Sequence, residues 1–130
     1  MIRVCFLLGV NSYRMSLAWT RIVPSGKKGG EVNKKAVAWY RDVLQALQDA
    51  NITPFVTLYH WDLPQSLHDE YGGWLDRRIV DDFEYYARVC FENLGDLVEN
   101  WFTHNEPNIL ACVLIVTSLL DPCLRSGSDL

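Results

Sequence analysis

The alternation of short strand-like segments with long amphipathic segments most constrains the fold. Residues 13–19, 53–60 and 100–105 are rich in aromatic and β-compatible side chains, and two helix-like segments separate them. Parallel strands need a long crossover connection, usually a helix, whereas a tight turn joins antiparallel ones. The order strand, helix, strand, helix, strand therefore predicts a parallel sheet in an α/β fold.

Both connecting segments carry apolar residues at spacings of three and four, with recognisable ends. Asn33 is placed to cap the first helix, and Asn51 is suited to a left-handed stop. Asp76 is the expected cap of the second helix, and Gly95 its end. The predicted buried stripes are Ala36, Val37, Tyr40, Val43, Leu44 and Leu47, then Ile79, Val80, Phe83, Tyr86, Ala87, Cys90, Phe91 and Leu94.

Strand alternation predicts which side chains share a face of the sheet. In the first strand it groups Arg14 with Ser16 and Ala18, and in the second it groups Val56 and Leu58 with His60. The connection over residues 61–75 is polar and contains Pro64 and Gly72-Gly73, so we expect a long loop there.

Composition favours a soluble globular protein that acts on neither nucleic acid nor membranes. The formal charge is −4 and 49% of the residues are hydrophobic. The apolar run at 109–120 holds about a dozen residues, fewer than the roughly 20 needed to span a bilayer, and residues 1–10 make no convincing signal peptide. The four cysteines form no C-x-x-C pair, which favours small buried thiols and a cytoplasmic location.

The segment Thr103-His104-Asn105-Glu106-Pro107 places a carboxylic acid where the last strand should stop, since Pro107 cannot donate to a strand ladder. Catalytic groups collect at the carboxyl ends of strands in a (β/α)-barrel. An Asn-Glu-Pro tripeptide on its own is also compatible with a simple turn. The surrounding sequence decides between these readings.

Four motifs in order resemble glycoside hydrolase family 1, the β-glucosidase family. They are Tyr13-Arg14-Met15-Ser16 with Trp19 and Arg21, then Tyr59-His60-Trp61-Asp62-Leu63-Pro64, then Gly72-Gly73-Trp74, and finally Thr103 with Asn105-Glu106-Pro107. The resemblance implies that residues 1–130 are part of a single catalytic domain, a partial TIM (β/α)₈ barrel with about strands 2 to 4. A complete barrel takes about 250 residues.

The resemblance also implies roles for individual residues in hydrolysis of O-glycosidic bonds with retention, without cofactor or metal. Glu106 matches the acid/base, which must keep its proton near neutral pH. Asn105, His60 and Trp61 match residues that bind the sugar, and Arg14 matches the arginine that orients the nucleophile. Glu106 argues against the thioglucosidase branch, where Gln replaces the acid.

Other readings of these residues remain open. His60, Asp62 and His68 could serve as metal ligands, although they lack regular ligand spacing. A further reading is a sugar-cleaving barrel of another family, because Asn-Glu at the end of a fourth strand also occurs in cellulase and xylanase barrels. His104 takes the variable position of its motif; it shares the parity of Phe102 and is expected to face the helices and pack there.

The resemblance fails at several points. The family's Thr-Glu-Asn-Gly nucleophile segment and its Gln-Ile-Glu-Gly segment do not occur, and residues 109–130 diverge, which predicts a poorly packed tail with 121–130 disordered. We therefore expect a truncated fragment with unpaired sheet edges and negligible hydrolysis by itself. The alternative is a non-catalytic remnant or pseudoenzyme that at most binds sugar. The choice of sugar and aglycone and the oligomeric state are not fixed by these residues.

Overall fold

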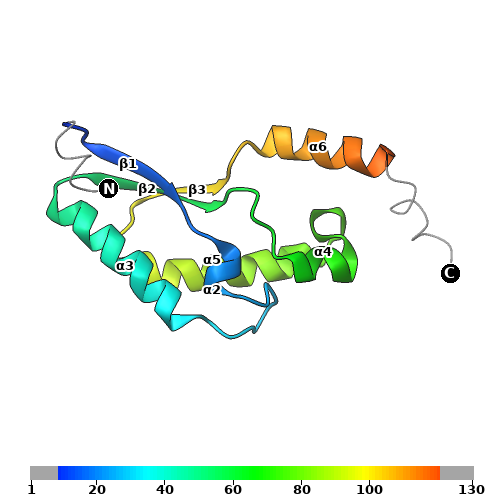
Figure 1. Cartoon of the computed structure of the whole chain (residues 1–130), viewed down its shortest axis with the longest axis horizontal. Coiled ribbons are helices and arrows are strands. Elements are labelled where there is room, and N and C mark those ends of the chain that lie inside the picture. The colour runs from blue at the N-terminus through cyan, green and yellow to red at the C-terminus, as the bar shows by residue number, and fades with distance from the viewer. Residues whose placement is uncertain (1–8, 121–130) are drawn as a thin grey trace.

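The computed structural model describes residues 9–120 and contains a three-stranded parallel sheet (Figure 1). The strands are β1 (Ser12–Ser16), β2 (Thr53–Tyr59) and β3 (Asn100–His104), in the order β1-β2-β3. Ser16 is in register with Thr57, and Thr57 with Phe102. The predicted parallel sheet and its order are confirmed.

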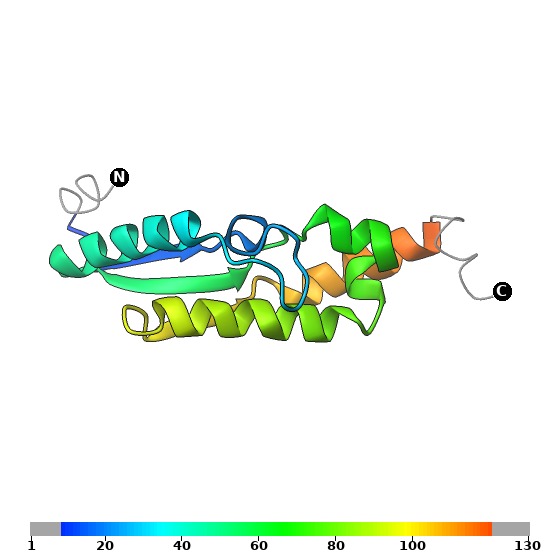
Figure 2. The ribbon, with the colours of Figure 1, turned by 90° about the horizontal axis from the view of Figure 1, so that it is seen from below.

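Two long helices run side by side beneath one face of this sheet (Figure 2). They are α3 (Lys34–Asp49) and α5 (Ile79–Leu94), and each connects one strand to the next. The side chain of Asn33 caps α3 by accepting from the Ala36 N–H at 3.2 Å, and Asn51 follows with φ of 55°. Both predictions at the ends of α3 are therefore confirmed.

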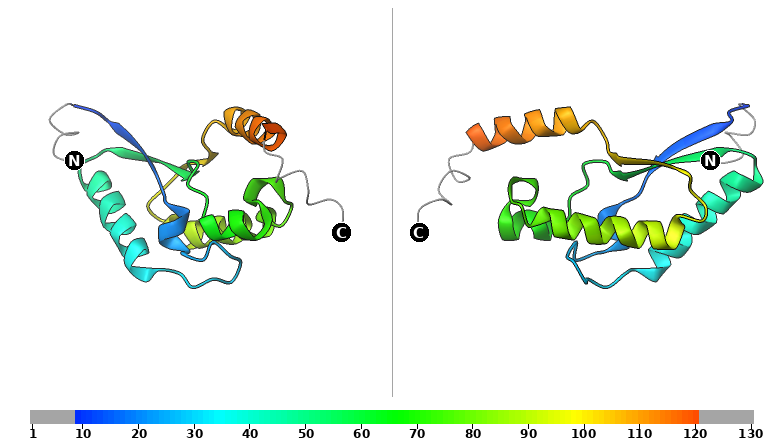
Figure 3. Two further views of the ribbon diagram at one scale, coloured as in Figure 1. Left: turned by 45° about the vertical axis from the view of Figure 1, so that its right-hand side comes forward. Right: turned by 180° about the vertical axis from the view of Figure 1, so that it is seen from behind.

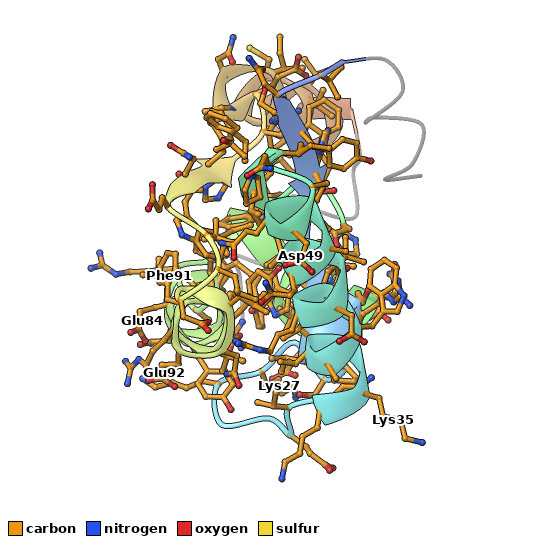
Figure 4. All side chains as sticks on the ribbon, turned by 90° about the vertical axis from the view of Figure 1, so that its left-hand side faces the viewer. Lys27, Lys35, Asp49, Glu84, Phe91 and Glu92 are labelled. Atoms are coloured by element: carbon orange, nitrogen blue, oxygen red, sulfur yellow. The ribbon has the colours of Figure 1, made fainter. Side chains whose placement is uncertain are left out.

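The core lies between these helices and the sheet. Val56 and Leu58 of β2, Leu44 and Leu47 of α3 and Leu94 of α5 are fully buried there. Figure 4 shows Lys35 on α3, and Glu84 and Glu92 on α5, pointing away from the core. Most residues of the predicted stripes therefore face the core. Val80 and Phe91 of α5 do not, because they are 61% and 44% exposed, so the prediction of burial was wrong for these two.

The other face of the sheet carries exposed side chains. Arg14 is exposed there, and the Phe102 ring beneath it is 42% exposed although it is large and apolar. Among the described residues, the edge strands β1 and β3 each pair only with β2. The fold is therefore a segment of an α/β barrel rather than a closed one.

Several sequence-based boundaries were wrong. The first strand was expected to reach Trp19, but it ends at Ser16, and the short helix α2 (Trp19–Ile22) begins where the Trp19 ring enters the core. The connection expected to be a loop contains α4 (Gln65–Tyr71) and a 3₁₀ turn, η1 (Gly73–Leu75). Helix α5 takes Arg78 rather than Asp76 as its cap position. The Asp76 carboxylate instead accepts the Arg78 N–H at 2.8 Å in the turn just before the helix.

After β3 the chain forms α6 (Pro107–Leu120), which extends beyond the carboxyl ends of the strands (Figure 3). Its residues Ile109, Val113 and Val116 are about half exposed. Within residues 9–120, no helix is both long and apolar enough to cross a membrane. The prediction of disorder for 121–130 falls outside the described residues.

Candidate active site

The five predicted site residues lie at or just beyond the carboxyl half of the sheet. Arg14 is in β1, His60 and Trp61 directly follow β2, and Asn105 and Glu106 directly follow β3. Parallel strands bring these positions to one edge. The structure therefore assembles residues that are up to 92 positions apart in the chain.

Arg14 connects all three strands. Its Nη2 donates to Asn105 Oδ1 at 2.6 Å, its Nε donates to Thr57 Oγ1 at 3.2 Å, and its guanidinium lies 4.8 Å from the centre of the Phe102 ring. Thr57 was not among the predicted site residues. The available signal in the sequence was strand alternation, which puts Thr57 on the face opposite Val56 and Leu58.

Asn105 is held by its backbone as well as its side chain. It is 8% exposed, its N–H donates to the Tyr59 carbonyl at 2.9 Å, and its own carbonyl accepts the Trp61 indole N–H at 2.9 Å. Trp61 therefore has a structural contact in addition to the sugar contact that the resemblance implies. It fixes the peptide unit that joins Asn105 to Glu106.

Glu106 is exposed and has a left-handed backbone with φ of 45°. Non-glycine residues rarely adopt this region, and such outliers gather at functional sites. The Glu106 carbonyl accepts the Leu110 N–H at 3.0 Å, so α6 begins immediately after the turn. The strand ends before Pro107 as expected, and Pro107 takes the first helical position, which needs no N–H.

His60 does not share the face of Val56 and Leu58, contrary to the strand-parity prediction. It is exposed, whereas those two residues are fully buried. The strand ends at Tyr59, so the alternation stops before His60. Instead His60 lines a surface hollow of about 340 Å³ together with Tyr13, Arg14, Met15, Ser16 and Thr57.

His104 packs against aromatic rings as predicted, but the parity argument behind that prediction was wrong. Its ring lies 4.8 Å from Phe83 and 5.0 Å from Trp74, and burial lowers its pKa. Phe102 instead lies under Arg14 on the other face. Phe102 and Thr103 are both exposed, so the alternation breaks between Phe102 and His104.

The residues considered for a metal site are used differently. Within residues 9–120, no group of three or more His, Cys, Asp or Glu side chains is arranged to hold a metal ion. Asp62 accepts backbone hydrogen bonds from Trp19 and His60, and burial raises the pKa of its carboxyl. A second hollow, lined by Gln48, Thr53, Asp96 and Glu99 among others, lies at the opposite end of the strands and contains none of the predicted site residues.

Comparison with known proteins decides the family. The sequence model described as glycosyl hydrolase family 1 matches residues 2–128. This chain belongs to glycosyl hydrolase family 1. The match includes the segment after Asn108 whose sequence diverges from the family's usual motif.

Similar members of family 1 include curated plant enzymes. The chain is 50% identical over 105 residues to a Triticum aestivum chloroplastic β-D-glucosidase of a benzoxazinyl glucoside, covering 81% of this chain and 18% of that protein. It is 54% identical over 99 residues to Myrosinase 2 of Arabidopsis thaliana, covering 76% and 18%. The chain therefore spans about a fifth of the length of these relatives.

Solved family 1 structures share the fold. A crystal structure of a rice β-glucosidase superposes with a TM-score of 0.81 and 50% sequence identity, covering 85% of this chain and 23% of the rice chain. This likeness supports the reading of β1, β2 and β3 as consecutive strands of a TIM barrel.

Proposed function

We propose that this chain supplies the acid/base part of a β-glucosidase-type site that hydrolyses O-glycosidic bonds with retention. The observation that carries the proposal is the hydrogen bond from Arg14 to Asn105 at one edge of the sheet, which places the residue preceding Glu106 beside an arginine that lines the same hollow as His60. In the proposed mechanism, Glu106 protonates the leaving oxygen and later removes a proton from the attacking water. Its exposed carboxyl is open to a substrate at that edge.

The neighbouring residues would position the sugar. Arg14 occupies the side-chain oxygen of Asn105, so the Asn105 amide N–H₂ is the group available to donate to a sugar hydroxyl. His60 and Arg14 line the hollow beside it. The resemblance assigns Arg14 a further contact, with the nucleophilic carboxylate of the retaining mechanism.

The 130-residue chain alone should not turn over substrate, because the sequence lacks the family's nucleophile segment. A retaining glycosidase needs two carboxyl groups about 5 to 5.5 Å apart. Incubation of the chain with an aryl β-glucoside should give no turnover. Turnover abolished by Glu106→Gln would contradict this expectation.

The catalytic role itself is tested by grafting residues 9–108 into the matching segment of the rice β-glucosidase. The graft should hydrolyse aryl β-glucosides. In the graft, Glu106→Gln should lower kcat/KM for a glucoside with a poor leaving group by about 10²-fold or more, the usual size of a general-acid contribution. It should leave kcat/KM for 2,4-dinitrophenyl glucoside nearly unchanged, since that leaving group needs no proton.

The matched control is Glu99→Gln, an exposed glutamate before β3 at the other end of the sheet. It should leave both substrates unaffected. Added azide should restore turnover of the Glu106→Gln graft as glucosyl azide, because azide needs no general base. A folded graft that binds glucose without hydrolysis would overturn the proposal in favour of a sugar-binding remnant.

A further inference from the structure

Asp62 joins the ends of two strands. Its Oδ2 accepts the Trp19 N–H at 3.0 Å, across 43 positions of the chain, and its Oδ1 accepts the His60 N–H at 3.4 Å. Trp19 starts α2 just after β1, and His60 directly follows β2. The two oxygens of one carboxylate thus connect the chain leaving β1 with the chain leaving β2.

Trp61 lies inside the turn that Asp62 closes. Its φ is 71°, a left-handed conformation that a bulky residue adopts only when its surroundings impose it. The hydrogen bond from His60 N–H to Asp62 spans this residue. The same carboxylate that anchors the turn to Trp19 therefore holds Trp61 in its left-handed conformation.

The turn aims the Trp61 indole at β3. The indole N–H donates to the Asn105 carbonyl at 2.9 Å, and that carbonyl belongs to the peptide bond preceding Glu106. Glu106 itself has φ of 45°, so the direction of its side chain depends on how this peptide unit is held. A continuous series of contacts leads from Asp62 through Trp61 to the proposed acid/base.

We propose that Asp62 is a positioning residue for Glu106, acting through Trp61 and the Asn105 carbonyl. This inference rests on the proposed function of Glu106. A carboxylate suits the role because it accepts on both oxygens, whereas Asn offers one acceptor and an N–H₂ that would face a backbone N–H. A Glu at position 62 would be one methylene longer than Asp62, so its carboxylate would not sit at the same place relative to the Trp19 amide.

The kinetic test uses Asp62→Asn in the rice graft. A misplaced acid slows only reactions that need protonation, and kcat/KM reports the steps through formation of the covalent intermediate. The loss of kcat/KM should therefore be at least about tenfold greater for a poor leaving group than for 2,4-dinitrophenyl glucoside. Equal losses for both substrates would show a merely structural role and overturn the proposal.

The control is Asp69→Asn, an exposed aspartate on α4 whose carboxylate accepts from the Gln65 side chain at 2.7 Å. It should leave the ratio between the two substrates unchanged. If the unmodified graft is folded but inactive, the proposed function fails. The contacts that lead from Asp62 through Trp61 to the Asn105 carbonyl are then tested separately, by a measurement on the 130-residue chain.

That measurement is hydrogen exchange by NMR on the full chain. In Asp62→Asn, exchange of the Trp19 amide and the Trp61 indole N–H should each accelerate by about tenfold or more, since both lose their fixed acceptor geometry. Asp69→Asn should change neither. Faster exchange at Trp19 with an unchanged Trp61 indole would show that Asp62 does not hold Trp61, and would overturn the proposal.

Discussion

Arg14 on β1 donates to the side-chain oxygen of Asn105, 91 residues later in the chain, over 2.6 Å. The bond crosses β2, and Thr57 on that strand accepts from the same guanidinium. This contact fixes the orientation of the Asn105 side-chain amide. The polar face of the sheet therefore sets the direction of the Asn105 N–H₂ that we propose donates to the sugar.

Replacing Arg14 with Met should release the Asn105 side chain. A hydrogen bond to a charged group contributes about 1.5–3 kcal/mol when buried, but Arg14 is exposed, so we expect a loss of about 1 kcal/mol. Urea denaturation measures this loss, and NMR relaxation should show greater mobility of the Asn105 side-chain amide. The control is Arg21→Met, which removes an arginine that lies over the Trp39 ring. An Asn105 amide unchanged in Arg14→Met would contradict the assignment.

The parts of the fold that depend on local sequence could be predicted. The cap of α3 at Asn33 and the left-handed Asn51 follow from short-range chemistry, and most of the buried helix positions, though not Val80 and Phe91, follow from helical periodicity. The parallel sheet follows from the helical crossovers between strands. The clustering of Arg14, Asn105 and Glu106 followed from the resemblance and from the geometry of parallel strand ends.

The parts that depend on tertiary contacts could not be predicted. Trp61 and Glu106 adopt left-handed backbones that neither residue type favours, and hydrogen bonds from distant segments hold the Trp61 turn. The break in alternation between Phe102 and His104 arises because one ring contacts Arg14 and the other contacts Phe83. Asp62 gave no sequence signal of its role, since its partners are backbone groups.

Tyr86→Phe should destabilise the core. The Tyr86 ring stacks on Trp19 with centroids 4.9 Å apart, and its hydroxyl donates to the Leu58 carbonyl at 2.8 Å in a fully buried position. Removing the hydroxyl leaves a buried carbonyl without that donor, which costs about 1–3 kcal/mol of unfolding free energy. Urea denaturation measures this change.

The matched control is Tyr85→Phe, whose hydroxyl donates to the Gly30 carbonyl from a half-buried position that water can reach. That variant should lose less stability than Tyr86→Phe. Equal losses for the two variants would show that burial of the Leu58 carbonyl is not the cause.

Gly26→Ala should loosen the loop between α2 and α3. A Cβ at Gly26 would meet Pro64 and Leu67 side-chain atoms at 2.8–2.9 Å, and the residue has φ of +73°. Gly29 is the matched control, because its φ is +74° and an added Cβ meets nothing within 4 Å. Both variants should lose about 1–2 kcal/mol from the left-handed backbone, and Gly26→Ala about 1–3 kcal/mol more from overpacking. Similar melting temperatures for the two variants would contradict the tight packing of Gly26 against α4.

His104 should make stability depend on pH. Burial lowers its pKa below the ordinary 6.5, so the folded chain favours the neutral ring. The resulting stabilisation is present above pH 6.5 and is lost as the pH falls through the lower folded-state pKa, because charging the ring among Tyr59, Trp74 and Phe83 is unfavourable. Urea denaturation at pH 7.5 and pH 5 should therefore show a larger loss of stability for the unmodified chain than for His104→Phe.

The exposed His68 serves as the control, since His68→Gln should retain the pH dependence of the unmodified chain. A pH dependence that survives in His104→Phe would assign it to other groups.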